Sequence, residues 1–117
     1  MTENVQTNEI ARLMDEGIDV DDLYETLAES AGLGADQIDK PSAGKAFFAR
    51  IWAQQKAAVC GNKLVQVYIR DPNASDATTI ATQVLGILVV IPGVNMAVIA
   101  CLAVRIGLRS LCAAPAQ

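Results

Sequence analysis

The sequence predicts an all-α fold, a compact bundle of about five helices around a buried and very apolar C-terminal helical hairpin. Two observations support this. Residues 77–104 form a run of 28 residues without a charged side chain, and a mostly apolar run of this kind must be hidden from water. Before this run, apolar residues recur every three or four positions, which is the spacing of helices with one apolar face. Those faces need an apolar partner, which the hairpin supplies.

The apolar run is divided near its middle by Pro92-Gly93, followed by Asn95. This combination is typical of a turn between helices, so we expect two arms, 77–91 and 94–112. Within the uncharged run each arm has about 14 residues, or about 21 Å of helix. That length is too short to cross a hydrocarbon layer of about 30 Å. The sequence therefore favours arms covered by protein, with a membrane span over 77–104 as the alternative and a mixed αβ fold as a third.

Two short helices are expected at the N-terminal end of the chain. The first covers about 8–16, with Gly17 as its C-cap. The second covers about 20–31, with Asp19 as its N-cap and Gly32 at its end. The apolar positions of these helices are Ile10, Leu13 and Met14 in the first, and Val20, Leu23, Leu27 and Ala31 in the second.

A third amphipathic helix is expected over about 43–59, capped by Ser42 and ended by Gly61. One face collects Phe47, Phe48, Ile51, Trp52, Gln55 and Val59. Most of the aromatic mass of the chain lies in this helix, so we expect it near the centre of the core. The segment before it, 32–42, contains two Gly and a Pro and is expected to be a loop, with one helical turn around 35–38.

The segment 63–70 (KLVQVYIR) is ambiguous. Its β-branched residues favour a strand, but no second strand is evident for it to pair with. Leu64, Val67 and Tyr68 also fit one face of a short helix, which is the interpretation we favour. The following segment, 71–75, has the composition of a turn. Ser75 or Asp76 can then cap a helix that begins at Ala77.

The chain is expected to form a single domain over 1–117. It comprises acidic amphipathic helices over 1–59, a connector over 60–75 and the apolar hairpin over 76–112. The net charge of −4 hides a strong asymmetry. Residues 1–39 contain eleven acids and one base, a balance of −10, whereas 40–117 contain eight bases and two acids, a balance of +6. The acidic front therefore suits a basic protein partner, or the basic rear of a second copy.

The candidate partner-binding face is a set of closely spaced carboxylates, which are Asp15, Glu16, Asp19, Asp21, Asp22 and Glu25. The competing interpretation is that these residues cap helices and solvate exposed faces. A calcium loop is not predicted, because starting at Asp15 or Asp19 places no Gly at position 6 and no Glu at position 12. Nucleic-acid binding is not predicted either, since the basic residues are scattered and no cluster alternates with exposed aromatic residues.

Residues that could carry catalysis are scarce. The chain has no His, which removes the commonest general base and metal ligand. Cys60, Cys101 and Cys112 are expected to be reduced thiols in a reducing compartment. The polar segment Met1–Asn8 lacks the pattern of a signal peptide. We therefore expect a cytoplasmic location, with membrane association as the alternative.

The sequence accordingly predicts a small, non-enzymatic, helical protein-interaction or regulatory module. It predicts no catalytic residue, no cofactor, no metal and no small-molecule substrate. The expected partner is another protein or a second copy of the chain. The alternative function is a membrane-inserting or membrane-anchored protein that uses the apolar 77–104 segment.

Overall fold

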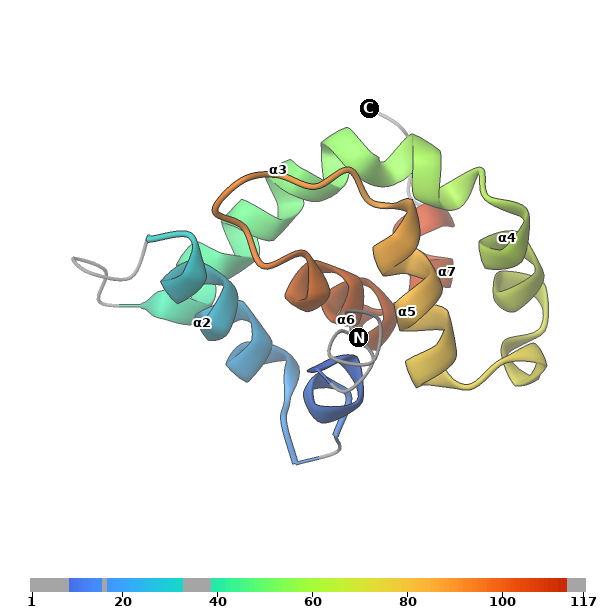
Figure 1. Ribbon diagram of the computed structural model, residues 1–117, viewed down its shortest axis with the longest axis horizontal. Coiled ribbons are helices and arrows are strands. Elements are labelled where there is room, and N and C mark those ends of the chain that lie inside the picture. The colour runs from blue at the N-terminus through green and yellow to red at the C-terminus, as the bar shows by residue number, and fades with distance from the viewer. Residues whose placement is uncertain (1–8, 16, 33–38, 114–117) are drawn as a thin grey trace.

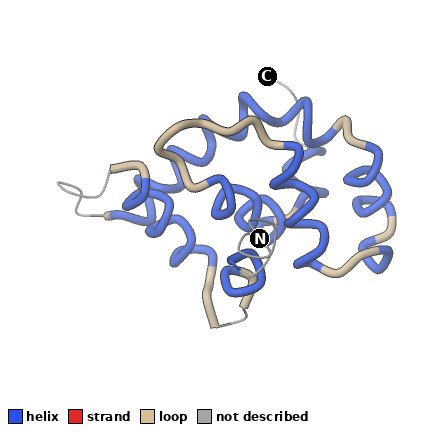
Figure 2. Tube along the Cα trace, in the orientation of Figure 1, coloured by secondary structure: helices blue, strands red, loops and turns tan. Residues whose placement is uncertain are grey.

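The computed structural model describes residues 9–15, 17–32 and 39–113, and every regular element within them is helical (Figures 1 and 2). The all-α prediction is therefore confirmed. Residues 9–13 are helical. The elements that follow are α2 (Val20–Ser30), α3 (Lys40–Cys60), α4 (Lys63–Arg70), the 3₁₀ helix η1 (Pro72–Ala74), α5 (Ala77–Ile87), α6 (Met96–Ile106) and α7 (Leu108–Ala113).

The start and end of α2 follow from its sequence as predicted. The Asp19 side chain accepts a hydrogen bond from the Asp22 amide, and the Asp22 side chain accepts one from the Asp19 amide, at 2.8 and 3.1 Å. This reciprocal pair satisfies two amides that the first turn leaves open. After the helix, Gly32 has a φ of 75°, a conformation that glycine adopts without steric cost.

The start of α3 differs from the prediction. The helix begins at Lys40, and its N-cap is Asp39, which accepts hydrogen bonds from both the amide and the hydroxyl of Ser42. Ser42 therefore lies inside the first turn. Pro41 explains the earlier start, because proline is well tolerated in the first turn of a helix. The expected helical turn over 35–38 lies outside the described residues.

The contact between α2 and α3 is unusually close at Gly44. A Cβ atom placed there would lie 1.9 Å from the backbone oxygen of Tyr24, so only glycine fits. Tyr24 then meets Phe48 edge to face at 6.3 Å between ring centroids, and Phe48 stacks on Trp52 at 6.0 Å. The aromatic face predicted for this helix is buried, apart from Phe47, which is half-buried.

The segment 63–70 is a helix, α4, as favoured by the sequence analysis. Asn62 caps it by accepting hydrogen bonds from the amides of Leu64 and Val65. The three residues that fit one helical face are not buried together. Val65 is buried and Tyr68 is half-buried, whereas Leu64 and Val67 are exposed.

The first arm of the apolar hairpin is shorter than predicted. Asp76 caps α5 through the Thr79 amide at 2.7 Å, but the helix ends at Ile87 rather than at residue 91. The buried side chain of Gln55 explains this end. Its Oε1 accepts a hydrogen bond from the Val89 amide at 3.1 Å, and its Nε2 donates one to the Val89 oxygen at 3.3 Å. These bonds hold residues 88–95 as a loop alongside α3 (Figure 1).

The second arm is divided into two helices. α6 begins at Met96, capped by Asn95, and ends at Ile106. Gly107 follows with a φ of 122°, which continues no helix, and α7 then runs from Leu108 to Ala113. The predicted 94–112 helix is thus broken at Gly107.

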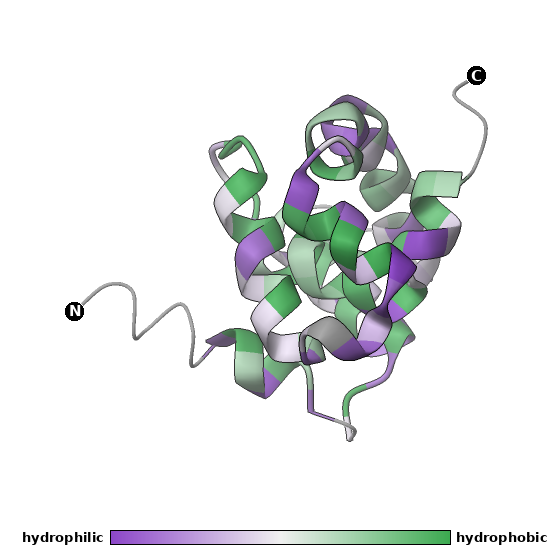
Figure 3. Cartoon of the chain, turned by 90° about the vertical axis from the view of Figure 1, so that its right-hand side faces the viewer, coloured by the Kyte–Doolittle hydropathy of each residue, from purple (hydrophilic) through white to green (hydrophobic). Residues whose placement is uncertain are grey.

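The centre of the core is α6. Eight consecutive residues, from Met96 to Ala103, are buried, and α2, α5 and α7 all contact this helix. Figure 3 shows how hydrophobic and hydrophilic residues alternate along the helices around this core. In the described part of the chain, no helix is both long enough and apolar enough to cross a membrane.

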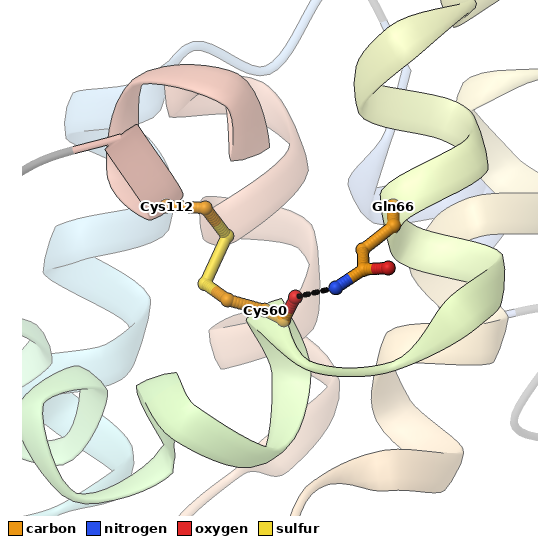
Figure 4. Close-up of a disulfide and its surroundings, with 3 residues drawn as sticks. All are labelled: Cys60, Gln66 and Cys112. Carbon is orange, nitrogen blue, oxygen red and sulfur yellow. Dashed lines mark hydrogen bonds between the residues drawn. A yellow bond between two sulfur atoms is a disulfide. The ribbon is translucent and has the colours of Figure 1, made fainter.

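The expectation of three reduced thiols is wrong for two of them. Cys60, at the end of α3, and Cys112, in α7, form a disulfide with a Cα–Cα separation of 5.6 Å (Figure 4). Beside it, Gln66 Nε2 donates a hydrogen bond to the Cys60 oxygen at 3.3 Å. The break at Gly107 allows α7 to turn towards the junction of α3 and α4. Cys101 is a free thiol, buried in α6.

The close contact at Gly44 predicts a severe effect of a single methyl group. Gly44→Ala should lower the free energy of unfolding by about 3 kcal/mol, because a backbone-to-backbone contact cannot relax by a rotamer change. Denaturant titration followed by circular dichroism measures this. Gly86→Ala is the matched control, since nothing lies within 4 Å of its Cβ position in α5. That variant should be unchanged or stabilised by up to about 1 kcal/mol. Equal stabilities of the two variants would contradict the packing described here.

The disulfide predicts a stability that depends on redox state. It joins residues separated by 52 positions, and a cross-link of that span stabilises by on the order of 4 kcal/mol through the unfolded chain. A thiol reductant should therefore lower the denaturation midpoint of the wild type. The Cys60→Ser variant should have the lower denaturation midpoint both with and without the reductant. If the denaturation midpoint of the wild type were the same with and without the reductant, the disulfide would be ruled out.

Candidate functional site

The predicted acidic face lies on α2 and on the loop before it. Asp15, Asp19, Asp21, Asp22 and Glu25 are all exposed, whereas Glu16 lies outside the described residues. We call the five described carboxylates the α2 acidic face. They do not act alike, because some of them make local hydrogen bonds and others do not.

Three of the five carboxylates bind backbone amides of their own segment. Asp19 and Asp22 form the reciprocal cap of α2 described above. Asp15 Oδ1 accepts a hydrogen bond from the Gly17 amide at 2.7 Å. These carboxylates shape the loop and the start of the helix, as the competing interpretation of the acidic run proposed.

Asp21 and Glu25 lie one turn apart on the solvent side of α2. Within the described residues neither forms an ion pair. The negative charge of Asp21 adds to the effect of burial in raising the pKa of Tyr24, with burial the larger cause. Glu29, one turn further on, differs because it pairs with Lys40 Nζ at 3.0 Å. Its hydrogen bond and its charge raise the pKa of Lys40.

The loop that carries Asp15 is held in place by Arg105, near the end of α6. Nη1 of its guanidinium donates hydrogen bonds to the oxygens of Leu13 and Asp15, at 3.4 and 3.3 Å, and Nη2 donates one to the Ile18 oxygen. A planar guanidinium can serve several carbonyls at once because its donors form a fixed fork. Arg105 thus provides donors for three backbone oxygens, those of Leu13, Asp15 and Ile18, and joins these residues to the core helix.

This role of Arg105 is not predicted from the sequence. A cation close to the end of an apolar helix suits the helix dipole, so its position has an explanation that requires no distant partner. A signal was nevertheless present, since Arg105 directly follows 28 uncharged residues and so lies beside the most deeply buried segment. An arginine there needs acceptors, and the loop carbonyls provide them.

The groups that most often carry chemistry are engaged or buried. Cys60 and Cys112 are joined in the disulfide, and desolvation by burial is the main cause that raises the pKa of the Cys101 thiol to about 12. That thiol is protonated at neutral pH and is not a nucleophile. Among residues 9–15, 17–32 and 39–113, no group of three or more His, Cys, Asp or Glu side chains could hold a metal ion.

Comparison with known proteins finds no family model, no curated protein and no solved structure that matches this chain. Its function therefore has to be inferred from its own residues.

The role of Arg105 predicts a loss of stability when its hydrogen bonds are removed. Arg105→Met keeps the apolar stem of the side chain but removes its donors, and it should lower the free energy of unfolding by about 2 kcal/mol, because bonds to charged donors are the stronger kind. Arg105→Lys should recover only part of this, since one ammonium lacks the fork. Arg109→Met, at an exposed position of α7, serves as the control and should change stability by less than about 0.5 kcal/mol. Equal effects of the two Met variants would refute the role assigned to Arg105.

Proposed function

We propose that this protein is a non-enzymatic interaction module that binds a basic protein surface through the α2 acidic face. The observation that carries the proposal is the pair Asp21 and Glu25, two exposed carboxylates one turn apart with no ion pair among the described residues. Asp15, Asp19 and Asp22 are tied to the backbone but keep their negative charge. Five carboxylates on one helix and its leading loop produce a strong local field for a cationic partner.

The geometry of the loop supports this proposal. Arg105 and the capping pair hold the charged residues on a defined backbone, so a partner would meet a pre-organised surface. Pre-organisation lowers the entropic cost of binding. The partner class is another protein with clustered Lys or Arg, or the basic residues of a second copy of this chain.

The membrane-inserting or membrane-anchored alternative based on residues 77–104 is less well supported. α5 and α6 have 11 residues each, or about 16 Å of helix, and most of α6 is covered by the rest of the protein. A cytoplasmic location stays a prediction with a weaker basis. It rested partly on reduced thiols, whereas disulfides such as Cys60–Cys112 persist mainly in oxidising compartments.

The proposal is tested by neutralising Asp21 and Glu25, the two carboxylates of the α2 acidic face that form neither a cap nor an ion pair among the described residues. The full chain, immobilised and exposed to an extract of its own cells, should retain a basic protein at low salt and release it as the salt concentration rises. The variant with both Asp21→Asn and Glu25→Gln should retain roughly threefold to 30-fold less of that protein, since each exposed charge contributes about 0.3 to 1 kcal/mol.

The control variant is Asp71→Asn, which removes one carboxylate from a different part of the chain. Asn still serves as a cap, so η1 should be kept and binding unchanged. Sedimentation of the purified chain separately tests self-association. If the amount of basic protein retained changed neither with salt nor with the double substitution, binding through the acidic face would be refuted.

A further inference from the structure

The large hydrophobic side chains that are exposed in the described part of the chain lie in two places. Leu64 and Val67 lie on α4, with exposed fractions of 55% and 43%. Val89 and Val90 lie on the 88–95 loop, at 66% and 75%. Single exposed apolar residues are ordinary on protein surfaces. The pair on α4 differs from the pair on the loop because cationic side chains lie beside it.

The solvent side of α4 combines this apolar pair with two cations. Lys63, Val67 and Arg70 lie at i, i+4 and i+7 and so form one stripe, with Leu64 beside it. All four residues are exposed, while Val65 on the opposite side is fully buried. No ion pair links Lys63 or Arg70 to a carboxylate among the described residues. We call these four residues the α4 face, an apolar centre with a cation at each end.

The surroundings of the α4 face are also free of acids on one side. Residues 40–70 contain six Lys and Arg and no Asp or Glu. The next two acids along the chain are exposed and act as caps. Asp71, directly after Arg70, accepts a hydrogen bond from the Asn73 amide, and Asp76 accepts one from the Thr79 amide. In Figure 1, α2 with its acidic face lies at the left of the molecule and α4 at the right. The two charged regions are therefore well separated.

A negatively charged partner fits the α4 face by charge. The small size of the α4 face favours a lipid surface over a protein as that partner. Eight residues span about 12 Å, whereas a stable protein interface buries about 800 Å² on each partner. A bilayer surface requires no matching shape, and it is bound by a few apolar side chains together with Lys and Arg near anionic headgroups. Long cationic side chains can reach the phosphates while their stems stay among apolar groups.

We propose that the α4 face binds an anionic lipid surface peripherally. Leu64 and Val67 enter the headgroup boundary, and Lys63 and Arg70 contact the lipid phosphates. The acidic α2 region faces away from the membrane, because the same surface repels it. This binding needs no membrane-spanning segment and does not depend on the α2 acidic face.

The test is co-sedimentation of the full chain with vesicles at low and at physiological salt. Vesicles of phosphatidylcholine with phosphatidylserine should bind the chain, vesicles of phosphatidylcholine alone should bind it far less, and salt should weaken the binding. Lys63→Gln together with Arg70→Gln should lower the partition coefficient about 30-fold, from about 1 kcal/mol per cation. Leu64→Ser together with Val67→Ser should lower it roughly tenfold or more.

The matched control is Val89→Ser together with Val90→Ser, which removes a second exposed apolar pair away from the α4 face. This variant should bind like the wild type. Circular dichroism on every variant verifies that the helices are kept. The proposal would be overturned if the chain did not bind the anionic vesicles or bound both kinds of vesicle equally. It would also be overturned if the control lost as much binding as the Leu64 and Val67 variant. Asp21→Asn with Glu25→Gln should leave vesicle binding intact or strengthen it, which separates this outcome from that of the acidic face.

Discussion

The burial of α6 from Met96 to Ala103 is the constraint on which the rest of the structure depends. A helix that is apolar on all sides is stable only when other elements cover it. α2 and α5 pack against it, and its ends are fixed by polar contacts to the N-terminal segment. At its start, Asn95 Nδ2 donates a hydrogen bond to Glu9 Oε2 at 3.3 Å. At its end, Arg105 holds the loop before α2. The acidic region is thus built onto the same helix that forms the core.

Much of this fold follows from local signals in the sequence. The caps Asp19 and Asp76 indicate the starts of two helices, and Gly32 indicates the end of the first, as the structure confirms. These signals are local because a cap and its amides lie within four residues of each other. The places where prediction failed depend on contacts between distant segments. The end of α5 is decided by Gln55, 34 positions away from Val89, and no local pattern reveals that contact.

The disulfide was missed for a related reason. Cys60 and Cys112 meet only because Gly107 breaks the final helix and turns α7 back, and an apolar setting around Cys112 is equally compatible with a free thiol. The acidic site was partly predictable. The sequence identified its carboxylates, and the structure divides them into residues tied to the backbone, such as Asp19, and residues without an ion pair, such as Asp21. Arg105, which holds the loop, could be located only through the packing of α6.

The two charged regions give the molecule two different surfaces. The acidic side chains extend from α2 and the loop before it, whereas the cations of α4 flank exposed apolar side chains. Proteins and lipids make different demands on a surface, since a protein partner needs complementary shape and charge over a large area, and a bilayer needs only apolar groups and cations at its boundary. The same small core can therefore present two surfaces of different chemistry.

The central claim, that protein covers α6 on all sides from Met96 to Ala103, is tested most directly by amide hydrogen exchange of the full chain in aqueous buffer without detergent. Core elements exchange through global opening, whereas exposed elements exchange through local opening. The account predicts that amides of residues 100–106 exchange most slowly in the chain, and that α4 and the 88–95 loop exchange much faster. Exchange in α6 as fast as in α4, or protection of α6 that appears only when detergent is added, would contradict it.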